Sequence, residues 1–139
     1  FSATPKYLSE TLRCLASFER ILPGHAAWKE CFDIYDPEAD SWSAGPPLPK
    51  GHSHAEGGTF VHGDRIYMVG GHTTAPGESK QTDADVLALS LGGEWEVVAT
   101  LPMPLSSPAA GIIGGKLYVA GGSPGNSAPQ ADMWVSDAP

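Results

Sequence analysis

The sequence is poor in charged residues, in cysteine and in long apolar runs. Charged residues make up 17% of the 139 residues, and the net charge is −8. Such a chain lacks the basic surface that binds phosphate backbones or anionic headgroups, so we expect neither nucleic acid nor a membrane as a partner. No apolar run approaches the roughly 18 residues that span a bilayer. Cys14 and Cys31 are too few for a disulfide scaffold, and fit either one bridge or two thiols.

Catalytic signatures are missing as well. The sequence contains no Gly-x-Ser-x-Gly, no P-loop, no His-Glu-x-x-His and no dinucleotide-binding pattern. The glycines between Gly111 and Gly115 precede an apolar run typical of a strand, so they are not a phosphate cradle at the start of a helix. We therefore predict no catalytic residue, no cofactor and no bound metal, and an enzyme is the less favoured interpretation.

Glycine and proline, in contrast, are abundant. The chain holds 17 Gly and 13 Pro, and 41% of its residues are hydrophobic. This hydrophobic content is enough for a packed core. So much glycine and proline favours many short elements joined by tight turns over long helices.

The chain repeats itself. The run Arg65 to Gly71 recurs as Lys116 to Gly122, and each copy is a basic residue, an apolar run with a central Tyr, and Gly-Gly. Trp42 and Trp95 are each followed by Leu-Pro at the same spacing, and Ala84-Asp85 recurs as Ala131-Asp132. Repeats at one period and in one order indicate a repeat architecture.

Each repeat has the pattern of β-structure. Apolar runs on both sides of Gly63-Asp64 predict a hairpin of residues 59–62 and 65–69, because glycine supplies the positive φ of a tight turn. Residues 86–91 and 95–99 are expected to be a third and a fourth strand, and the prolines after Leu101 end the fourth. Residues 110–113 and 116–120 repeat the hairpin.

These motifs resemble the kelch repeat. The matching pieces are Ile66 to Gly71, the Tyr-Asp-Pro of Ile34 to Pro37, and Trp42. The second copy keeps Trp95 but lacks the Tyr-Asp. The resemblance covers residues 32–137 and implies an all-β fold of four-stranded β-propeller blades. On this basis residues 32–139 are the repeat region, with a partial blade at 32–50, a full blade at 55–104 and a partial blade at 108–137. We expect an incomplete ring, because a closed propeller has four to eight blades.

The first 31 residues do not follow the repeat. The leucines and isoleucines between Leu8 and Leu22 fall near one face of a helix. Pro5 is suited to the first turn of such a helix, and Pro23-Gly24 would end it. We predict an N-terminal extension at 1–31 with an amphipathic helix at about 5–22. We expect this helix to cap an open blade face in preference to binding a partner or a second copy, and disorder or a segment that is not native to a propeller is the remaining alternative.

Candidate site residues fall on one face of the expected blades. The loop between the second and third strands and the connection between blades emerge on the same face, which receives residues 50–57, 72–84, 105–109 and 123–131. Long loops on a rigid scaffold are the usual carriers of function. The candidate ligand-binding residues there are His52, His54, Glu56, His72, Lys80, Asn126 and Gln130.

The two histidines of His52-Ser53-His54 are the residues most suggestive of a site, because residues i and i+2 of a strand share a face. With Glu56 they offer nitrogen and oxygen ligands, but the next repeat has Ser106 and Ser107 at these positions. A structural or channel-lining role is favoured over ligand contact, and metal binding is the least favoured. Asp83 or Asp85 is expected to cap a turn.

Three functions fit these patterns. The favoured one is a kelch-type binding module whose loops on one face contact a protein or glycan. The alternatives are a fragment of a kelch-like carbohydrate-active enzyme, of the oxidase or epimerase type, and a structural unit that closes a ring with copies of itself or with missing blades. A shared scaffold does not choose among them.

Overall fold

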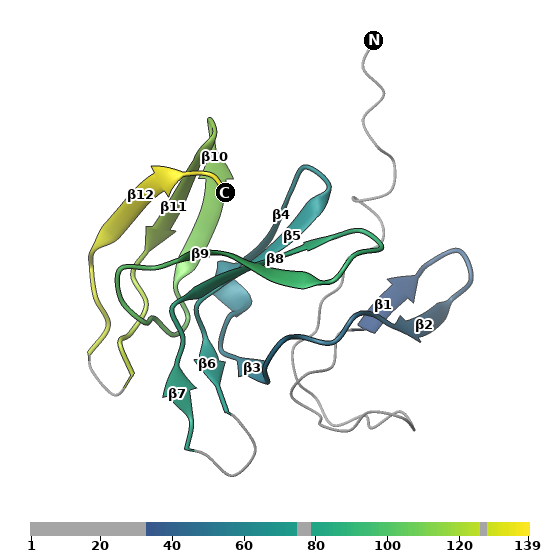
Figure 1. Ribbon diagram of the computed structural model, residues 1–139, viewed down its shortest axis with the longest axis horizontal. Coiled ribbons are helices and arrows are strands. Elements are labelled where there is room, and N and C mark those ends of the chain that lie inside the picture. Colours follow the sequence, from purple (N-terminus) through teal and green to yellow (C-terminus); the bar gives the residue numbers. More distant parts are fainter. Residues whose placement is uncertain (1–32, 75–78, 126–127) are drawn as a thin grey trace.

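The computed structural model describes residues 33–74, 79–125 and 128–139. The expected helix at 5–22, Cys14, Cys31 and Asn126 lie outside these residues. In the described part, no helix is long and apolar enough to cross a membrane. The fold there is all-β and consists of several small antiparallel sheets, an arrangement compatible with blades of a β-propeller (Figure 1).

The strands form one complete blade with a partial blade on each side. The complete blade has the order β4 (Thr59–His62), β5 (Arg65–Val69), β8 (Asp85–Ser90), β9 (Trp95–Thr100). Before it lies the hairpin of β1 (Asp33–Asp36) and β2 (Ser41–Ala44). After it lies the sheet of β10 (Ala109–Ile113), β11 (Lys116–Ala120) and β12 (Met133–Asp137).

The strands predicted from the repeat are confirmed. The predicted hairpin has His62 opposite Arg65, and Gly63 in its turn has a φ of 64°. The prediction missed three two-residue strands in the loops: β3 (His52–Ser53), β6 (His72–Thr73) and β7 (Gln81–Thr82). These pair as β3–β6–β7, and a short 3-10 turn, η1 (Glu56–Gly58), precedes β4.

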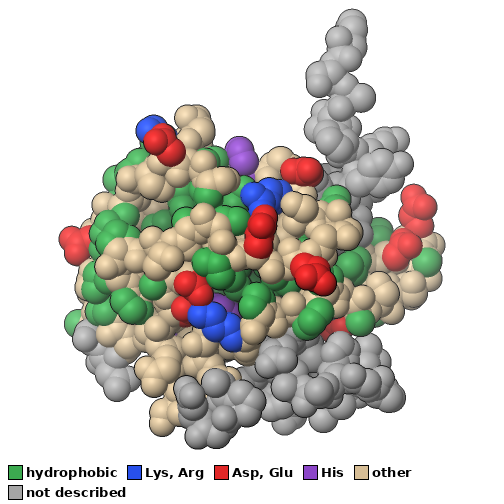
Figure 2. Space-filling model, viewed as in Figure 1, with side chains coloured by type: hydrophobic (Ala, Val, Ile, Leu, Met, Phe, Trp, Pro, Cys, Tyr) green, Lys and Arg blue, Asp and Glu red, His purple; other side chains and the backbone are tan. Residues whose placement is uncertain are grey.

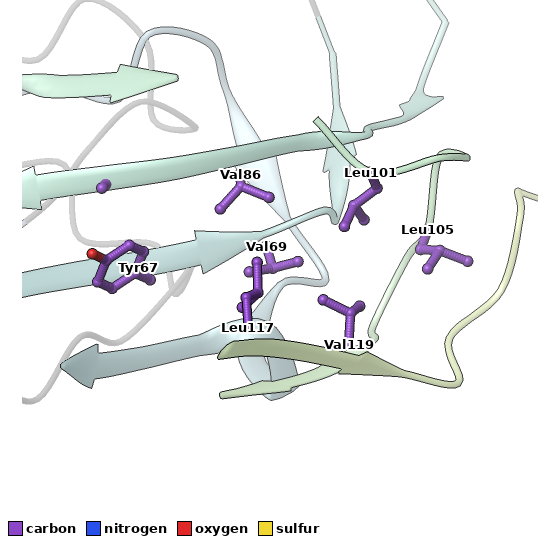
Figure 3. Close-up of a cluster of buried hydrophobic side chains, with 8 residues drawn as sticks. Tyr67, Val69, Val86, Leu101, Leu105, Leu117 and Val119 are labelled. Atoms are coloured by element: carbon purple, nitrogen blue, oxygen red, sulfur yellow. The ribbon is translucent and has the colours of Figure 1, made fainter. Parts of the chain in front are cut away.

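Both faces of the complete blade are covered, because apolar residues alternate along β5 and β8. Ile66, Met68, Leu87 and Leu89 turn to one face, where they pack with Leu48 and Trp95. Tyr67, Val69, Val86 and Ala88 turn to the other and pack against Leu117 and Val119 of β11, with Leu101 and Leu105 closing one end of the interface (Figure 3). The core therefore consists of two layers between successive blades.

Gly70-Gly71, at the end of β5, lies where the backbone of the next repeat comes closest. The φ values are 62° and 109°, which L side chains rarely adopt. A Cβ on Gly70 would lie 2.4 Å from the Leu105 carbonyl oxygen, and one on Gly71 would lie 2.8 Å from that of Ser53. The Gly71 N–H donates to the Leu105 carbonyl over 2.7 Å. Hence Gly-Gly is required by the contact between repeats as well as by a turn.

The outer sheet faces expose apolar side chains. Ile113, Met133 and Val135 of the last sheet are 72%, 62% and 50% exposed. Tyr118 holds the position that Tyr67 holds one repeat earlier, where the following sheet buries it. Of the three tryptophans that the structure describes, Trp95 is buried and Trp134 packs against the core, but Trp42 is half exposed.

Replacing Gly70 with Ala is expected to lower the free energy of unfolding by about 3 kcal/mol, because it adds both left-handed strain and a backbone clash. The matched control is Gly63→Ala, with the same sign of φ but no atom within 4 Å of the added Cβ. It is expected to cost about 1 kcal/mol. Chemical denaturation of both variants measures the difference, and equal losses would contradict the close-approach argument.

Candidate functional site

The candidate site is the loop face formed by the small sheet β3–β6–β7 and the start of the next repeat. The loop of residues 72–84, expected as an irregular segment, begins and ends as paired strand. Backbone hydrogen bonds tie the sheet to the next repeat, because Ser107 N–H donates to the His54 carbonyl over 2.8 Å. Ser106 and Ser123 form a bridge there. Loops of two repeats thus meet on one rigid platform, and the opposite ends of the hairpins are tight turns.

The small sheet has two different faces. Directly paired residues of antiparallel strands share a face. His52 pairs with Thr73, and Ser53 with His72. His54, next in the chain, has a φ of 57° and therefore leaves the alternation of β3. Its ring lies against His72, so the two histidines of the motif separate: His52 goes to one face and His54 to the other.

His52 belongs to an ion cluster that is buried at His52 and Asp83 and partly exposed at Lys50 and Asp85. Its Nε2 lies 3.2 Å from both the Gly70 carbonyl oxygen and Asp83 Oδ2, and its Nδ1 lies 3.4 Å from the Lys50 carbonyl oxygen. Lys50 Nζ lies 3.2 Å from Asp83 Oδ1 and 2.6 Å from Asp85 Oδ2. The cluster joins the segment before the complete blade to the entry of β8, so its first role is structural.

Asp83 is at the centre of this cluster. Its Oδ1 accepts the backbone N–H groups of Ala84 at 2.9 Å and Asp85 at 3.4 Å, which confirms the predicted turn cap. Burial alone would raise the pKa of Asp83, but the adjacent His52 ring and the hydrogen bond from Lys50 lower it to about 2. Burial would likewise lower the pKa of Lys50, and its bonds to Asp85 and Asp83 raise it above the usual value.

The next repeat builds the same junction without charge. Gln130 stands where Asp83 does, because its N–H donates to the Gly122 carbonyl as that of Asp83 donates to Gly71. The pairing of Ser106 with Ser123 matches that of Ser53 with His72, so Leu105, and not the serine expected from the sequence, stands at the position of His52. Met103 stands at the position of Lys50, and Leu105 is fully buried. Buried ion clusters are commonly replaceable by apolar residues. The scaffold therefore does not require these charges.

His54 and His72 form the second feature of the platform. Their rings meet edge to face with centroids 4.9 Å apart. His72 is 7% exposed, and burial, Lys80 and His54 together lower its pKa. His54 is exposed, and its Nδ1 lies 3.2 Å from Ser53 Oγ. This pair was not foreseen, because the two residues are 18 positions apart and only the β3–β6 pairing brings them together.

The remaining predicted residues are distributed over the same face. Glu56 is exposed on η1, and Lys80 is exposed just before β7. Gln130 is half-buried at the junction described above. The described residues include no group of three or more His, Cys, Asp or Glu side chains placed to hold a metal ion. Sequence reasoning missed Lys50, whose only signal is its place directly after Leu48-Pro49.

Basic side chains on the surface lie beside acidic ones (Figure 2). Arg65 pairs with Glu96, Lys116 with Asp137, and Lys50 with Asp83 and Asp85. Among the basic residues that the structure describes, Lys80 is the exception, with no carboxylate in ion-pair contact. The loop face is thus the described region that presents an unpaired positive charge.

Comparison with known proteins points to the same repeat. The chain is similar to Kelch-like protein terF of Aspergillus terreus, with 30% identity over 92 residues. The match covers 64% of this chain and 20% of the relative, so the chain spans about a fifth of that protein's length. No family model matches the chain. The similarity supports kelch repeats at the level of the scaffold.

The ion cluster is expected to make stability depend on acid pH. Because the folded-state pKa of Asp83 is about 2, below its ordinary 3.8, its contribution is complete above pH 4 and is lost as the pH falls towards 2. The loss is about 2 kcal/mol in the free energy of unfolding. Denaturation from pH 5 to 2 should show this slope in the natural chain and not in Asp83→Asn.

Two controls separate the cluster from general acid effects. The Asp85→Asn variant retains Asp83, so we expect its free energy of unfolding to depend on pH as that of the natural chain does. The combined variant Lys50→Met, His52→Leu, Asp83→Gln adopts the residues of the next repeat, so we expect it to fold without the slope. If the Asp83→Asn variant loses stability between pH 5 and 2 as steeply as the natural chain does, other carboxylates cause the pH dependence.

Proposed function

We propose that this chain is part of a kelch-repeat interaction module that binds a protein or glycan partner on the loop face. The observation that carries the proposal is the convergence of loops from two repeats on the β3–β6–β7 platform. Surface loops held by a rigid scaffold are the usual place for recognition. The similarity to a kelch-like protein supports the scaffold, and the partner is inferred from the loop face alone.

The exposed side chains suit contact with a polar partner. His54, Glu56, Lys80 and Ser107 are exposed on this face and offer hydrogen-bond donors and acceptors and charges of both signs. The ion cluster below them holds the platform in place. Platforms that are ordered before binding lose less entropy on association.

The proposal is tested with a photo-crosslinking amino acid placed at one position at a time. Positions 54, 80 and 107 sample the loop face, and positions 64 and 94 sample the tight turns at the other end of the blade. In extract from the source cells, we expect crosslinks to one recurrent partner from the first group only. A glycan partner would instead give binding of a glycan array that His54→Asn and Lys80→Gln weaken together.

Crosslinks of equal yield from both ends, with no glycan binding, would contradict the proposal. The Glu94→Lys variant is the matched surface control, because it changes the charge at the end of the blade opposite the loop face. It is expected to leave partner binding unchanged.

A second candidate function is ring closure by self-assembly, and the exposed outer face of the last sheet favours it. Ile113, Met133 and Val135 lie on the face equivalent to the one that the following sheet covers in the complete blade. Exposed apolar faces of this kind mark interaction sites. A second copy or a further blade would cover it.

Light scattering after size exclusion tests this candidate. Self-assembly predicts a discrete multiple of 14.5 kDa that Val135→Lys reduces to the monomer. The matched control is Leu91→Lys, in the exposed turn between β8 and β9, which should leave the mass unchanged. A monomeric natural chain would contradict self-assembly and leave the loop-face proposal untouched.

A further inference from the structure

One side of the small sheet β3–β6–β7 gathers groups that suit an anion. Paired residues of antiparallel strands share a face, so Ser53, His72 and Thr82 lie together on one side. We call the side of Ser53, His72 and Thr82 the His72 face. The sheet lies at the loop end of the complete blade (Figure 1).

Two more side chains join the His72 face. The ring of His54 contacts that of His72, with centroids 4.9 Å apart. Lys80 stands two residues before Thr82, so the alternation of an extended chain puts it on the same side. In agreement with this placement, burial, the charge of Lys80 and the His54 ring lower the pKa of His72. Lys80 is exposed, and no ion pair joins it to a carboxylate among the described residues.

The carboxylates of this region are placed differently. Asp83 follows Thr82 directly, so it starts on the other side of the sheet, where His52 and Lys50 contact it. Glu56 is exposed on η1, two residues after His54. The small sheet thus separates its charges, with a paired carboxylate on one side and an unpaired ammonium group on the other.

Neutral hydrogen-bonding groups accompany the charge. Ser53 and Thr82 are half-buried, and both carry hydroxyl groups. A Cβ added to Gly125 would lie 3.3 Å from Thr82 Oγ1, so the loop of the next repeat borders the His72 face. His72 is 7% exposed, and its Nδ1 is buried without a hydrogen-bond partner among the described residues. Buried polar atoms are normally paired, so water or a ligand group is expected to complete this one.

The composition of the His72 face selects the class of anion. Lys80 is its only lysine or arginine, and the lowered pKa keeps His72 neutral at pH 7. A phosphate group carries nearly two negative charges and is usually bound by clustered arginines. A single ammonium group with neutral hydroxyl donors is better matched to one carboxylate. The residues named on this face include no Trp, Tyr or Phe on which a sugar ring could stack, which favours an acidic amino acid over an acidic sugar.

We propose that the His72 face binds the carboxylate of an aspartate or glutamate side chain of a protein partner. Lys80 is its ion-pair partner, and the hydroxyl groups of Ser53 and Thr82 donate hydrogen bonds to it. This inference rests on the proposed function and narrows its partner to a protein with an acidic residue at the contact.

The charge of the rest of the chain makes this contact selective. The net charge is −8, and the other basic residues that the structure describes, Lys50, Arg65 and Lys116, are already paired with carboxylates. An acidic segment is therefore disfavoured elsewhere on the described surface, and such repulsion fixes how a partner is oriented. The next repeat has Ser107 and Ser123 at the positions of His54 and His72, so this group of side chains occurs once in the described repeats.

The test is binding of the full chain to an array of short peptides of varied sequence, made in matched pairs that differ only by Glu or Gln at the central position. We expect the Glu member of the bound pairs to bind about two- to fivefold more tightly, which is the range of one exposed ion pair. Lys80→Gln should bring the ratio close to one, and Lys80→Glu should reverse the preference. With a bound Glu peptide, the side-chain NMR signals of Lys80 and Thr82 should shift.

Two variants serve as matched controls. Lys116→Gln removes an exposed lysine at the opposite end of the hairpins, and should leave the ratio unchanged. Glu56→Gln removes a negative charge beside the face, and should keep or raise the preference for Glu. A polar contact that ignores charge would instead respond to Lys80→Gln and Glu56→Gln in the same direction.

The inference is overturned if Glu and Gln members bind alike, if no Glu peptide binds, or if Lys80→Gln retains the preference of the natural chain. Binding of acidic glycans that depends on Lys80, without a preference for Glu among peptides, would overturn the protein source of the carboxylate. Crosslinks confined to the loop face, without any preference for Glu, would overturn this inference and leave the proposed function standing. Loss of both results would overturn the two together.

Discussion

The close approach of backbone between successive repeats is the constraint on which the rest of this structure depends. At Gly70-Gly71 the chain leaves a buried strand, turns with positive φ, and touches the backbone of Leu105 and Ser53. No side chain fits into that space. The contact sets where the loops begin, brings β3 beside β6, and joins the loop of one repeat to the start of the next. The ion cluster and the contact between His54 and His72 both depend on this backbone junction, because it brings their side chains together.

The same backbone junction occurs twice in the described chain, each time with different side chains packed in it. In the complete blade it contains Lys50, His52 and Asp83, and in the next repeat it contains Met103, Leu105 and Gln130. Apolar packing and paired charge thus serve the same backbone geometry, as expected where an ion cluster is no more stabilising than apolar residues of similar volume in its place. The charged version fixes side-chain positions beneath the loop face. It therefore connects packing inside the blade to the surface that we propose for recognition.

Much of the fold was predictable from local pattern. The repeats, the strands around Gly63-Asp64 and Gly92-Gly93, and the all-β class follow from alternating apolar residues and glycine turns, since both act over a few residues. The small strands of the loops were not predictable, because two-residue strands carry no periodic signal. The meeting of the long loops on one face was predicted correctly. Which histidines meet on it was not, because the left-handed conformation at His54 reverses the side on which its ring lies.

The sequence by itself determined the scaffold: the period, the Gly-Gly pairs, and the alternation that buries both faces of the complete blade. These are properties of neighbouring residues, and they need no knowledge of distant ones. Only the tertiary structure decided the chemistry of the loop face. It buried His52 against Asp83, set His54 against His72, and left Lys80 without an acidic partner among the described residues. The physical reason is that charge pairing and ring contact depend on the separation of side chains in space, and here that separation is set by hydrogen bonds between segments far apart in the chain.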